Sequence, residues 1–299
     1  MMNNATENNL RFMLRPVQRG LLLLLLVLLG YVVASVLSAL VLGREVTAAR
    51  VSIVTVVQDI FVFIVPALVA ALLSTRRPAE LLGIDVRPGA AAVIVALLCL
   101  LCSIPAMNMV VDWNANVELP RGLGEMANWM RAMEESANNT LKVLFGNGSV
   151  MNLIMALLVV GVFAGFSEEL LFRGAIQRMM ITANVNAHVA IWVTAFIFSA
   201  VHLQFFGFVP RLLLGAMFGY MAWWSGSVWL SVAAHVTNNA LAATSMWLTA
   251  RGATDGMLEL NKCGTESPLL VVTSVIVTAT MLAILYKITR RKKIPATAD

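Results

Sequence analysis

The chain has 299 residues, of which 60% are hydrophobic and 12% are charged, and its mean hydropathy is +0.84. Soluble domains carry about a quarter charged residues, so this composition excludes a protein with a fully water-facing surface and indicates lipid as the main solvent. A net charge of +5 would suit a nucleic-acid partner. The basic residues lie beside apolar runs, however, so we attribute them to membrane topology and expect no nucleic-acid partner.

Apolar runs of about 20 residues, long enough to cross a bilayer, recur along the chain. They predict an all-α, polytopic membrane bundle of about eight transmembrane helices. The runs lie near 21–42, 51–73, 89–110, 151–171, 187–208, 210–224, 227–248 and 268–287. We interpret the first run as a retained helix, because it is longer than the apolar part of a signal peptide.

Basic residues gather in four places, and loops rich in lysine and arginine lie on the cytoplasmic side of a membrane. The four groups are Arg11, Arg15 and Arg19; Arg76, Arg77 and Arg87; Arg173 and Arg178, expected in a loop; and Lys287, Arg290, Arg291, Lys292 and Lys293. An even number of helices places all four groups on one side. We therefore predict a multi-pass protein of the inner (plasma) membrane with both termini in the cytoplasm.

We divide the chain into three parts. Residues 1–150 hold the first three helices and an outer loop, 151–248 a core with the intramembrane ionisable groups, and 249–299 a second outer loop, the last helix and a basic tail. The outer loop at about 111–150 is acid-rich, and its apolar residues recur at helical spacing. This pattern predicts an amphipathic helix, either at the membrane interface or packed on the bundle as a lid.

Two adjacent glutamates, Glu168 and Glu169, lie at the end of the fourth run. Ionisable residues in a membrane segment are costly and therefore tend to be functional. Glu169 and Arg173 are four residues apart and can form an ion pair, whereas Glu168 points about 100° away around the helix axis. A carboxylate without that partner, partly removed from water, suits a general base. The alternative is that both glutamates reach from a helix end to the membrane surface.

The chain contains three histidines, two of which, His202 and His235, lie inside apolar runs. Asn239 follows His235 by one helical turn and shares its face. A lone membrane histidine often only hydrogen-bonds two helices, but two of them with a glutamate pair favour a catalytic site. The third, His188, lies at a predicted helix start, and we predict an interfacial position for it.

The predicted helices leave one difficulty. Hydropathy places Glu168 near the inner end of the fourth run and His202 toward the outer half of the fifth. They can meet only if the fourth helix continues past Arg173, or if the fifth tilts or shifts. Apolar residues at Ile176 and Met179 favour the extension, which would move Glu168 nearer the middle of the membrane.

Three motifs follow one another on separate predicted helices: Glu168-Glu169-x-x-x-Arg173, Phe198-x-x-x-His202 and His235-x-x-x-Asn239. In these residues the chain resembles the CPBP family of intramembrane peptidases, which comprises CAAX proteases and bacteriocin-processing enzymes and is also called the Abi family. Each motif alone is weak, but the three together are fairly specific, and they make 151–248 the expected catalytic core. The resemblance implies that Glu169 and Arg173 hold the site in shape.

The resemblance further implies that Glu168 and His202 activate the attacking water. It implies that His235 and Asn239 stabilise the oxyanion. The family is often called a metalloprotease, and Glu168, His202 and His235 would make an acceptable Zn²⁺ set with an open position. The same groups could activate water unaided, and we favour a site without a metal or other cofactor.

Two other functions compete with an endopeptidase that cleaves a peptide or a membrane-tethered protein. One is a proton-coupled transporter, since intramembrane glutamate and histidine also form proton relays; Asp59 in the second run would serve it. The other is a catalytically idle immunity or scaffold protein of the same fold, which would be expected to lack a motif residue.

Overall fold

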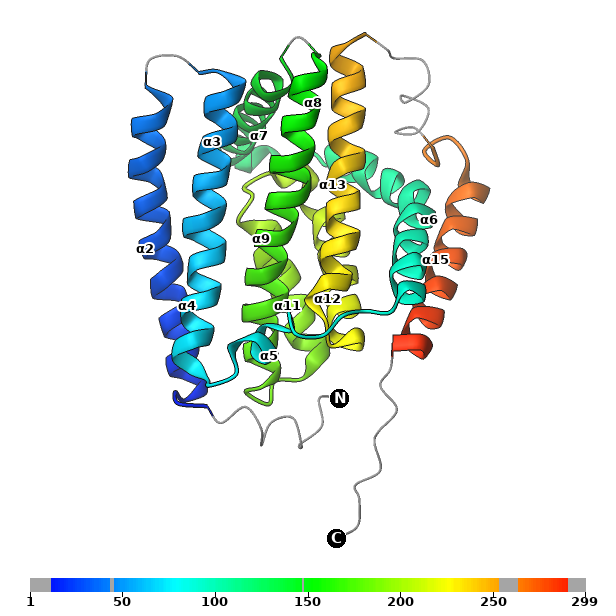
Figure 1. Ribbon diagram of the computed structural model, residues 1–299. Coiled ribbons are helices and arrows are strands. Elements are labelled where there is room, and N and C mark those ends of the chain that lie inside the picture. The colour runs from blue at the N-terminus through cyan, green and yellow to red at the C-terminus, as the bar shows by residue number, and fades with distance from the viewer. Residues whose placement is uncertain (1–11, 44–45, 147, 253–262, 290–299) are drawn as a thin grey trace.

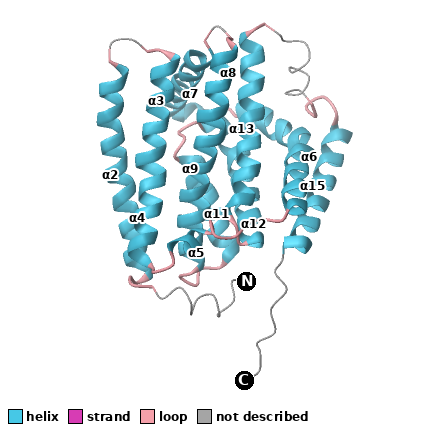
Figure 2. Cartoon of the chain, in the orientation of Figure 1, coloured by secondary structure: helices cyan, strands magenta, loops and turns pink. Residues whose placement is uncertain are grey.

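The computed structural model describes residues 12–43, 46–146, 148–252 and 263–289. Over these ranges the chain forms helices joined by loops, without a β-strand (Figures 1 and 2). The predicted all-α class is confirmed. Five residues of the predicted basic groups lie outside the described residues: Arg11, Arg290, Arg291, Lys292 and Lys293.

The helices follow one another along the chain as follows. They are α2 (Pro16–Leu42), α3 (Ala48–Gln58), η1 (Asp59–Ile64), α4 (Val65–Ser74), α5 (Pro78–Leu82), α6 (Ala90–Ala115), η2 (Arg121–Leu123), α7 (Gly124–Phe145), α8 (Val150–Ala156), η3 (Leu157–Ala164), α9 (Gly165–Glu169), η4 (Leu170–Gln177), α10 (Arg178–Ile181), α11 (Ala187–Ala200), η5 (Phe205–Gly207), α12 (Phe208–Ser225), α13 (Val228–Ala250) and α15 (Pro268–Thr289). Of the η segments, η1, η3 and η4 are π-helical, and η2 and η5 are 3₁₀ turns.

Six helical segments are long and apolar enough to cross a membrane: Pro16–Leu42, Ala48–Ser74, Ala90–Ala115, Val150–Ile181, Phe205–Ser225 and Pro268–Thr289. The predicted number of eight is therefore not confirmed. The predicted span 187–208 is interrupted, because α11 ends at Ala200 after 14 residues, a length of about 21 Å against a hydrocarbon core of about 30 Å. The chain turns there, with Leu203 at a positive φ of 53°.

The outermost helices expose apolar side chains along their length. Leu21, Leu25 and Leu28 are exposed on α2, as are Leu269 and Ile276 on α15. Soluble monomers rarely present a continuous apolar surface of this kind, whereas lipid accepts it. Together with the six candidate spans, this surface identifies a multi-pass membrane protein.

The fourth long helix continues well past its predicted end. Val150–Ile181 forms one helix of 32 residues, built from α8, η3, α9, η4 and α10. Apolar residues carry it onward, and Met179 and Ile181 are buried. The prediction that Arg173 and Arg178 lie in a loop is therefore wrong. Arg19 likewise belongs to a helix, α2, rather than to a basic tail, and it is buried.

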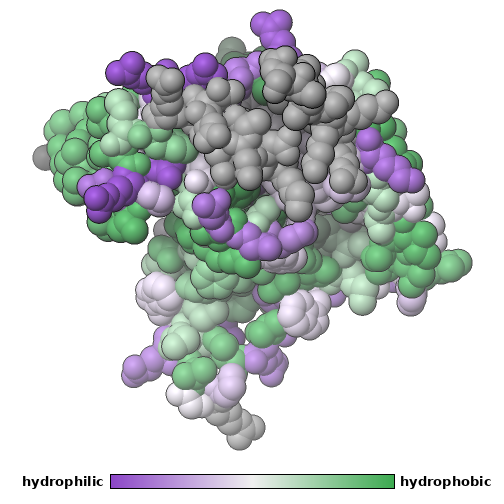
Figure 3. Space-filling model, turned by 90° about the horizontal axis from the view of Figure 1, so that it is seen from below, coloured by the Kyte–Doolittle hydropathy of each residue, from purple (hydrophilic) through white to green (hydrophobic). Residues whose placement is uncertain are grey.

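One end of the bundle carries exposed basic residues. The start of α2, the chain between α4 and α5, the end of α10 and the end of α15 all lie at the lower end of the bundle (Figure 1). Arg15, Arg76, Arg77 and Lys287 are exposed there. Seen from below, hydrophilic side chains lie among hydrophobic ones on this face (Figure 3). Three of the four predicted basic groups therefore contribute exposed residues to this end of the bundle.

The opposite half of the bundle holds α7, the helix predicted in the outer loop. Leu144 and Phe145 at its end are buried, whereas Met126 and Trp129 are exposed. The Trp129 ring also contacts Phe205 of η5, with ring centroids 5.2 Å apart. The helix thus packs over the turn between α11 and α12 while presenting part of its apolar face outward.

Candidate active site

The predicted ion pair between Glu169 and Arg173 is present at the centre of the bundle. The Arg173 Nη1 donates to Glu169 Oε1 over 2.6 Å, and both side chains have 0% exposure. Glu169 is the last residue of α9 and Arg173 lies in η4. The two side chains still meet, although the helix changes from α to π between them. A buried ion pair is tolerated only when further contacts compensate for lost hydration.

Those contacts come from α11 and α12. The second terminal nitrogen of Arg173 donates to the Gly215 carbonyl over 2.9 Å, and the guanidinium lies 4.6 Å from the centre of the Phe198 ring. One turn on, Gln177 donates to the Gly219 carbonyl over 3.0 Å. Small residues spaced four apart let membrane helices approach closely. A Cβ on Gly215 would lie 3.3 Å from Arg173 Nη2, so the glycine leaves room for the arginine.

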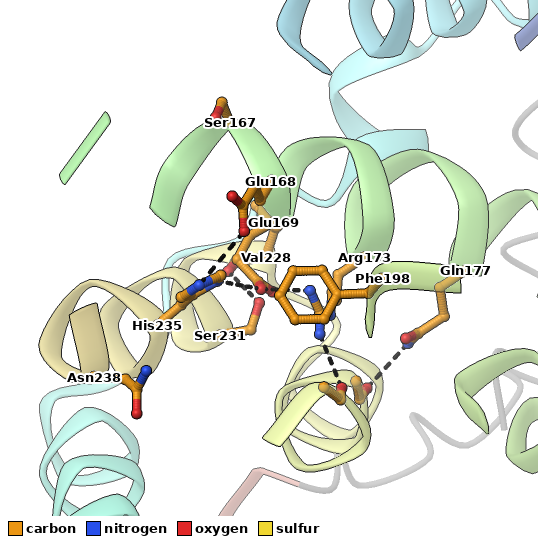
Figure 4. Close-up of polar contacts among 12 residues, drawn as sticks. Ser167, Glu168, Glu169, Arg173, Gln177, Phe198, Val228, Ser231, His235 and Asn238 are labelled. Atoms are coloured by element: carbon orange, nitrogen blue, oxygen red, sulfur yellow. Dashed lines mark hydrogen bonds and ion pairs between the residues drawn. The ribbon is translucent and has the colours of Figure 1, made fainter. Parts of the chain in front are cut away.

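His235 lies between the two glutamates (Figure 4). Its Nδ1 is 2.8 Å from Glu169 Oε1, and its Nε2 is 3.6 Å from Glu168 Oε2. A carboxylate paired with arginine can only accept, so His235 donates its Nδ1 hydrogen to Glu169. This bond sets the tautomer and directs Nε2 toward Glu168.

Glu168 is the more accessible of the two acids. Its side chain is 14% exposed, against 0% for Glu169, and both glutamate side chains point toward His235 (Figure 4). The preceding hydroxyl, on Ser167, is buried and donates to the Ala164 carbonyl over 3.0 Å. Glu169 is thus paired with Arg173, whereas Glu168 lies outside that pair and 3.6 Å from His235.

His202 lies in the turn that follows α11. Its Nδ1 donates to the Phe198 carbonyl over 2.7 Å, which leaves Nε2 for a ligand or a water molecule. Glu168, Arg211 and His235 all act on it electrostatically, so it borders the same site. The separation predicted from hydropathy disappears for two reasons: the fourth helix continues past Glu168, and α11 stops short.

Asn239 faces the backbone of the fourth helix. Its amide nitrogen donates to the Val160 carbonyl over 3.0 Å, within the π-helical segment η3. A π-helical turn disturbs the regular i→i−4 pattern and can leave a carbonyl in need of a partner. Asn239 supplies that partner, which ties α13 to the fourth helix four residues from His235.

Residues 150–241 match the model of a protein family described as type II CAAX prenyl endopeptidase Rce1-like. Over this segment the chain is similar to that family. The segment runs from the start of α8 to two residues beyond Asn239, so it contains all three motifs, and the resemblance to CAAX proteases is confirmed. The match gives no support to the bacteriocin-processing branch or to a metalloprotease. Neither curated proteins nor solved structures yield a match to the chain.

The predicted Zn²⁺ set does not form in this arrangement of the Rce1-like segment. Among the described residues, no three histidine, cysteine, aspartate or glutamate side chains converge as metal ligands. His235 donates from Nδ1 to Glu169 and His202 donates from Nδ1 to a carbonyl, a pattern that is compatible with metal binding through Nε2. Both Nε2 atoms and Glu168 would therefore have to move closer together to hold a zinc ion.

Several residues that shape the site could not be recognised from the sequence alone. Phe198 is 3% exposed, and its ring packs edge-on against both His202 and His235, at centroid distances of 5.1 and 5.7 Å. Phe218 stacks on His235 at 5.2 Å. The F-x-x-x-H motif contained Phe198 without indicating its contacts. These buried aromatic side chains restrict the orientation of both imidazole rings.

Proposed function

We propose that the protein is an intramembrane endopeptidase of the CAAX-protease type that hydrolyses a peptide bond with water activated by Glu168. The observation that carries the proposal is the position of His235, hydrogen-bonded to Glu169 on one side and facing Glu168 on the other. A histidine held in one tautomer beside an accessible carboxylate suits acid–base chemistry. The Rce1-like match supports a protease acting on a peptide or protein.

The proposed reaction begins with a water molecule bound to Glu168 and the Nε2 of His202. The separation of 3.6 Å between Glu168 and His235 is too long for a direct hydrogen bond and leaves room for a reacting group beside both. Glu168 takes a proton from the water as its oxygen bonds to the substrate carbonyl carbon. The C–N bond then breaks, and Glu168 returns the proton to the leaving amine.

The remaining residues stabilise this reaction or position its groups. Once its Nε2 has taken up a proton from solvent, His235 donates from that nitrogen to the oxyanion. Glu169 and Arg173 hold that ring in place, and their ion pair keeps a second carboxylate out of the reaction. The hydrogen bond from Asn239 to Val160 supports a positioning role rather than direct contact with the oxyanion. Electrostatic stabilisation of this kind is usually a large part of catalysis.

We propose a peptide or membrane-tethered protein as the substrate, because the site lies within a bundle of apolar helices. The exposed apolar helices indicate the lipid bilayer as the surrounding medium. We place the protein in the inner (plasma) membrane, with both termini cytoplasmic, from the basic residues at the lower end of the bundle. Metal-free catalysis is part of the proposal, since Glu168 and the Nε2 of His202 could activate water unaided.

The three histidines offer an internal comparison. His202→Ala and His235→Ala should lose most cleavage of a peptide substrate, because each removes an imidazole beside Glu168. His188 is exposed, and its Nδ1 lies 2.8 Å from the Tyr220 hydroxyl, so His188→Ala should cleave at nearly the wild-type rate. Initial rates at matched protein concentration measure the difference. Equal loss in all three variants would contradict the assignment.

The proposed topology has its own test. Reporter domains fused after Asn138, on α7, and after the C-terminus should lie on opposite sides of the membrane, with the C-terminal reporter in the cytoplasm. The reason is the exposed basic residues at the end of the bundle opposite α7. Protease protection or enzymatic reporters give the answer in intact cells. Both reporters on one side would contradict the orientation.

The transporter remains the second candidate because one observation favours it. Asp59, on η1, is buried and lies within electrostatic range of Glu168. Two neighbouring intramembrane acids could pass a proton. Loss of function on replacing Asp59 cannot separate the two candidates, since that residue borders the proposed catalytic base. Detection of a cleaved product separates them.

A further inference from the structure

The π-helical segment η1 brings a third carboxyl group to the site. Asp59, its first residue, is 3% exposed, and its Oδ2 is buried without a hydrogen-bond partner. Segment η1 packs against α9, which carries Ser167 and Glu168, and both act on the Asp59 carboxyl group. Asp59 belongs to α3–η1–α4, outside the Rce1-like segment, and none of the three motifs includes it.

The charge balance around Asp59 restricts what it can do. Ion pairs and hydrogen bonds normally compensate a buried carboxylate. The charged group that acts on Asp59 is instead another acid, Glu168, and the described residues provide no cation to either oxygen. Helix α2 approaches η1 so closely that a Cβ atom on Gly30 would clash with the Phe61 carbonyl. Two neighbouring carboxyl groups in a buried site without a cation repel each other when both are ionised, so the arrangement is favoured when one of them is protonated.

The surroundings indicate which acid holds the proton. Glu168 is 14% exposed and borders the site, whereas Asp59 is almost completely enclosed. Ser167 uses its hydroxyl hydrogen on the Ala164 carbonyl, so its oxygen is left as an acceptor. A protonated carboxyl group on Asp59 can donate to that oxygen, and an ionised one cannot.

We propose that Asp59 is a positioning residue of the site, whose protonated carboxyl group donates to Ser167 and leaves Glu168 as the ionised member of the Asp59–Glu168 pair. This inference rests on the proposed function and adds a residue from the second long helix to it. Asp59 acts through Ser167 and Glu168 and does not touch the substrate.

Infrared spectroscopy of the purified full-length protein at neutral pH tests the proposal directly. The wild type should show the C=O band of a protonated carboxyl group, and Asp59→Asn should lose it. Glu168→Gln and the exposed control Asp112→Asn should keep it. An identical band in the wild type and Asp59→Asn, or no such band in the wild type, would overturn the proposal. Should Asp59→Asn fail to fold, Asp59→Glu should keep a protonated band at a shifted position, and its absence would count equally against the proposal.

Cleavage kinetics supply the second readout. Asp59→Leu removes the hydrogen bond and should lower kcat roughly 10- to 100-fold, as for the loss of one hydrogen bond near a charged group, with little change in KM. Asp59→Asn keeps a neutral donor and should restore most of the rate. A wild-type kcat in Asp59→Leu would refute the positioning role. If the wild type cleaves no peptide while the infrared band behaves as expected, the peptidase function fails and the proton on Asp59 stands.

Discussion

Glu168→Gln should fold normally and lose turnover by a factor on the order of 10²–10⁴, the usual contribution of a general base. Glutamine keeps the size and hydrogen-bonding capacity of the side chain but cannot take a proton from water. Because Glu168 is partly exposed and is outside the Arg173 ion pair, its replacement should leave the thermal stability unchanged. Substrate binding should persist, so the loss falls on kcat.

The exposed residue Glu125, on α7, offers a matched control. Glu125→Gln makes the same chemical change far from the histidines and should cleave at the wild-type rate. Elemental analysis and a chelator titration of the same wild-type preparation should show activity that does not follow the zinc content. Full activity in Glu168→Gln would eliminate the proposed mechanism and bring the transporter forward.

Arg173→Ala should be the most destabilising single change in the site. It would strand the Glu169 carboxylate in a place with 0% exposure, and removing one partner of a buried ion pair costs about 3–5 kcal/mol. Activity should be lost too, because Glu169 also holds His235. Reversible unfolding in mixed detergent micelles, followed by tryptophan fluorescence, measures the change in unfolding free energy.

Two companion variants separate stability from activity. Arg77 makes an exposed pair with Glu80 at 3.3 Å, so Arg77→Ala should change stability by less than about 1 kcal/mol. Glu169→Leu combined with Arg173→Leu removes both charges and should recover most of the stability while remaining inactive, since His235 loses its acceptor. A stable and active Arg173→Ala protein would show that the buried pair has no role.

Local spacing predicted the features of the site that depend on one helix. The i,i+4 relation between Glu169 and Arg173 is determined by helix geometry alone, and the pair is present. The three motifs also lie within residues 150–241, the segment that matches the family model. The exposed position of His188 follows from its place at a helix start, where Asn186 caps the backbone of α11.

Features that depend on contacts between helices could not be predicted in this way. The bond from His235 to Glu169 joins residues 66 positions apart. Hydropathy also ended the fourth run at residue 171, because two arginines follow it and are typical of a loop, whereas the helix extends to Ile181. The structure buries one of these in an ion pair. It bonds the other, Arg178, to the carbonyls of Glu80 and Gly226.

Hydropathy also did not predict the number of membrane-spanning helices correctly. An apolar run of spanning length covers α11 and the turn after it, but hydropathy does not register that the helix stops at Ala200. Ser199 donates to the Phe208 carbonyl and holds α11 and α12 together as a short hairpin. The π-helical segments could not be predicted from the sequence either, because the sequence pattern of a π-turn resembles that of an α-helix. These segments position Asp59, Val160 and Arg173.

The measurement that tests the central claim most directly is a comparison of peptides released by cells that carry wild-type protein or Glu168→Gln. Mass spectrometry of membrane and secreted fractions, with growth in ¹⁸O-enriched water, identifies new C-termini and the origin of their oxygen. We predict a set of fragments that needs Glu168 and carries one solvent oxygen at the new carboxyl group. Identical fragment sets from the two strains would contradict hydrolysis by this site.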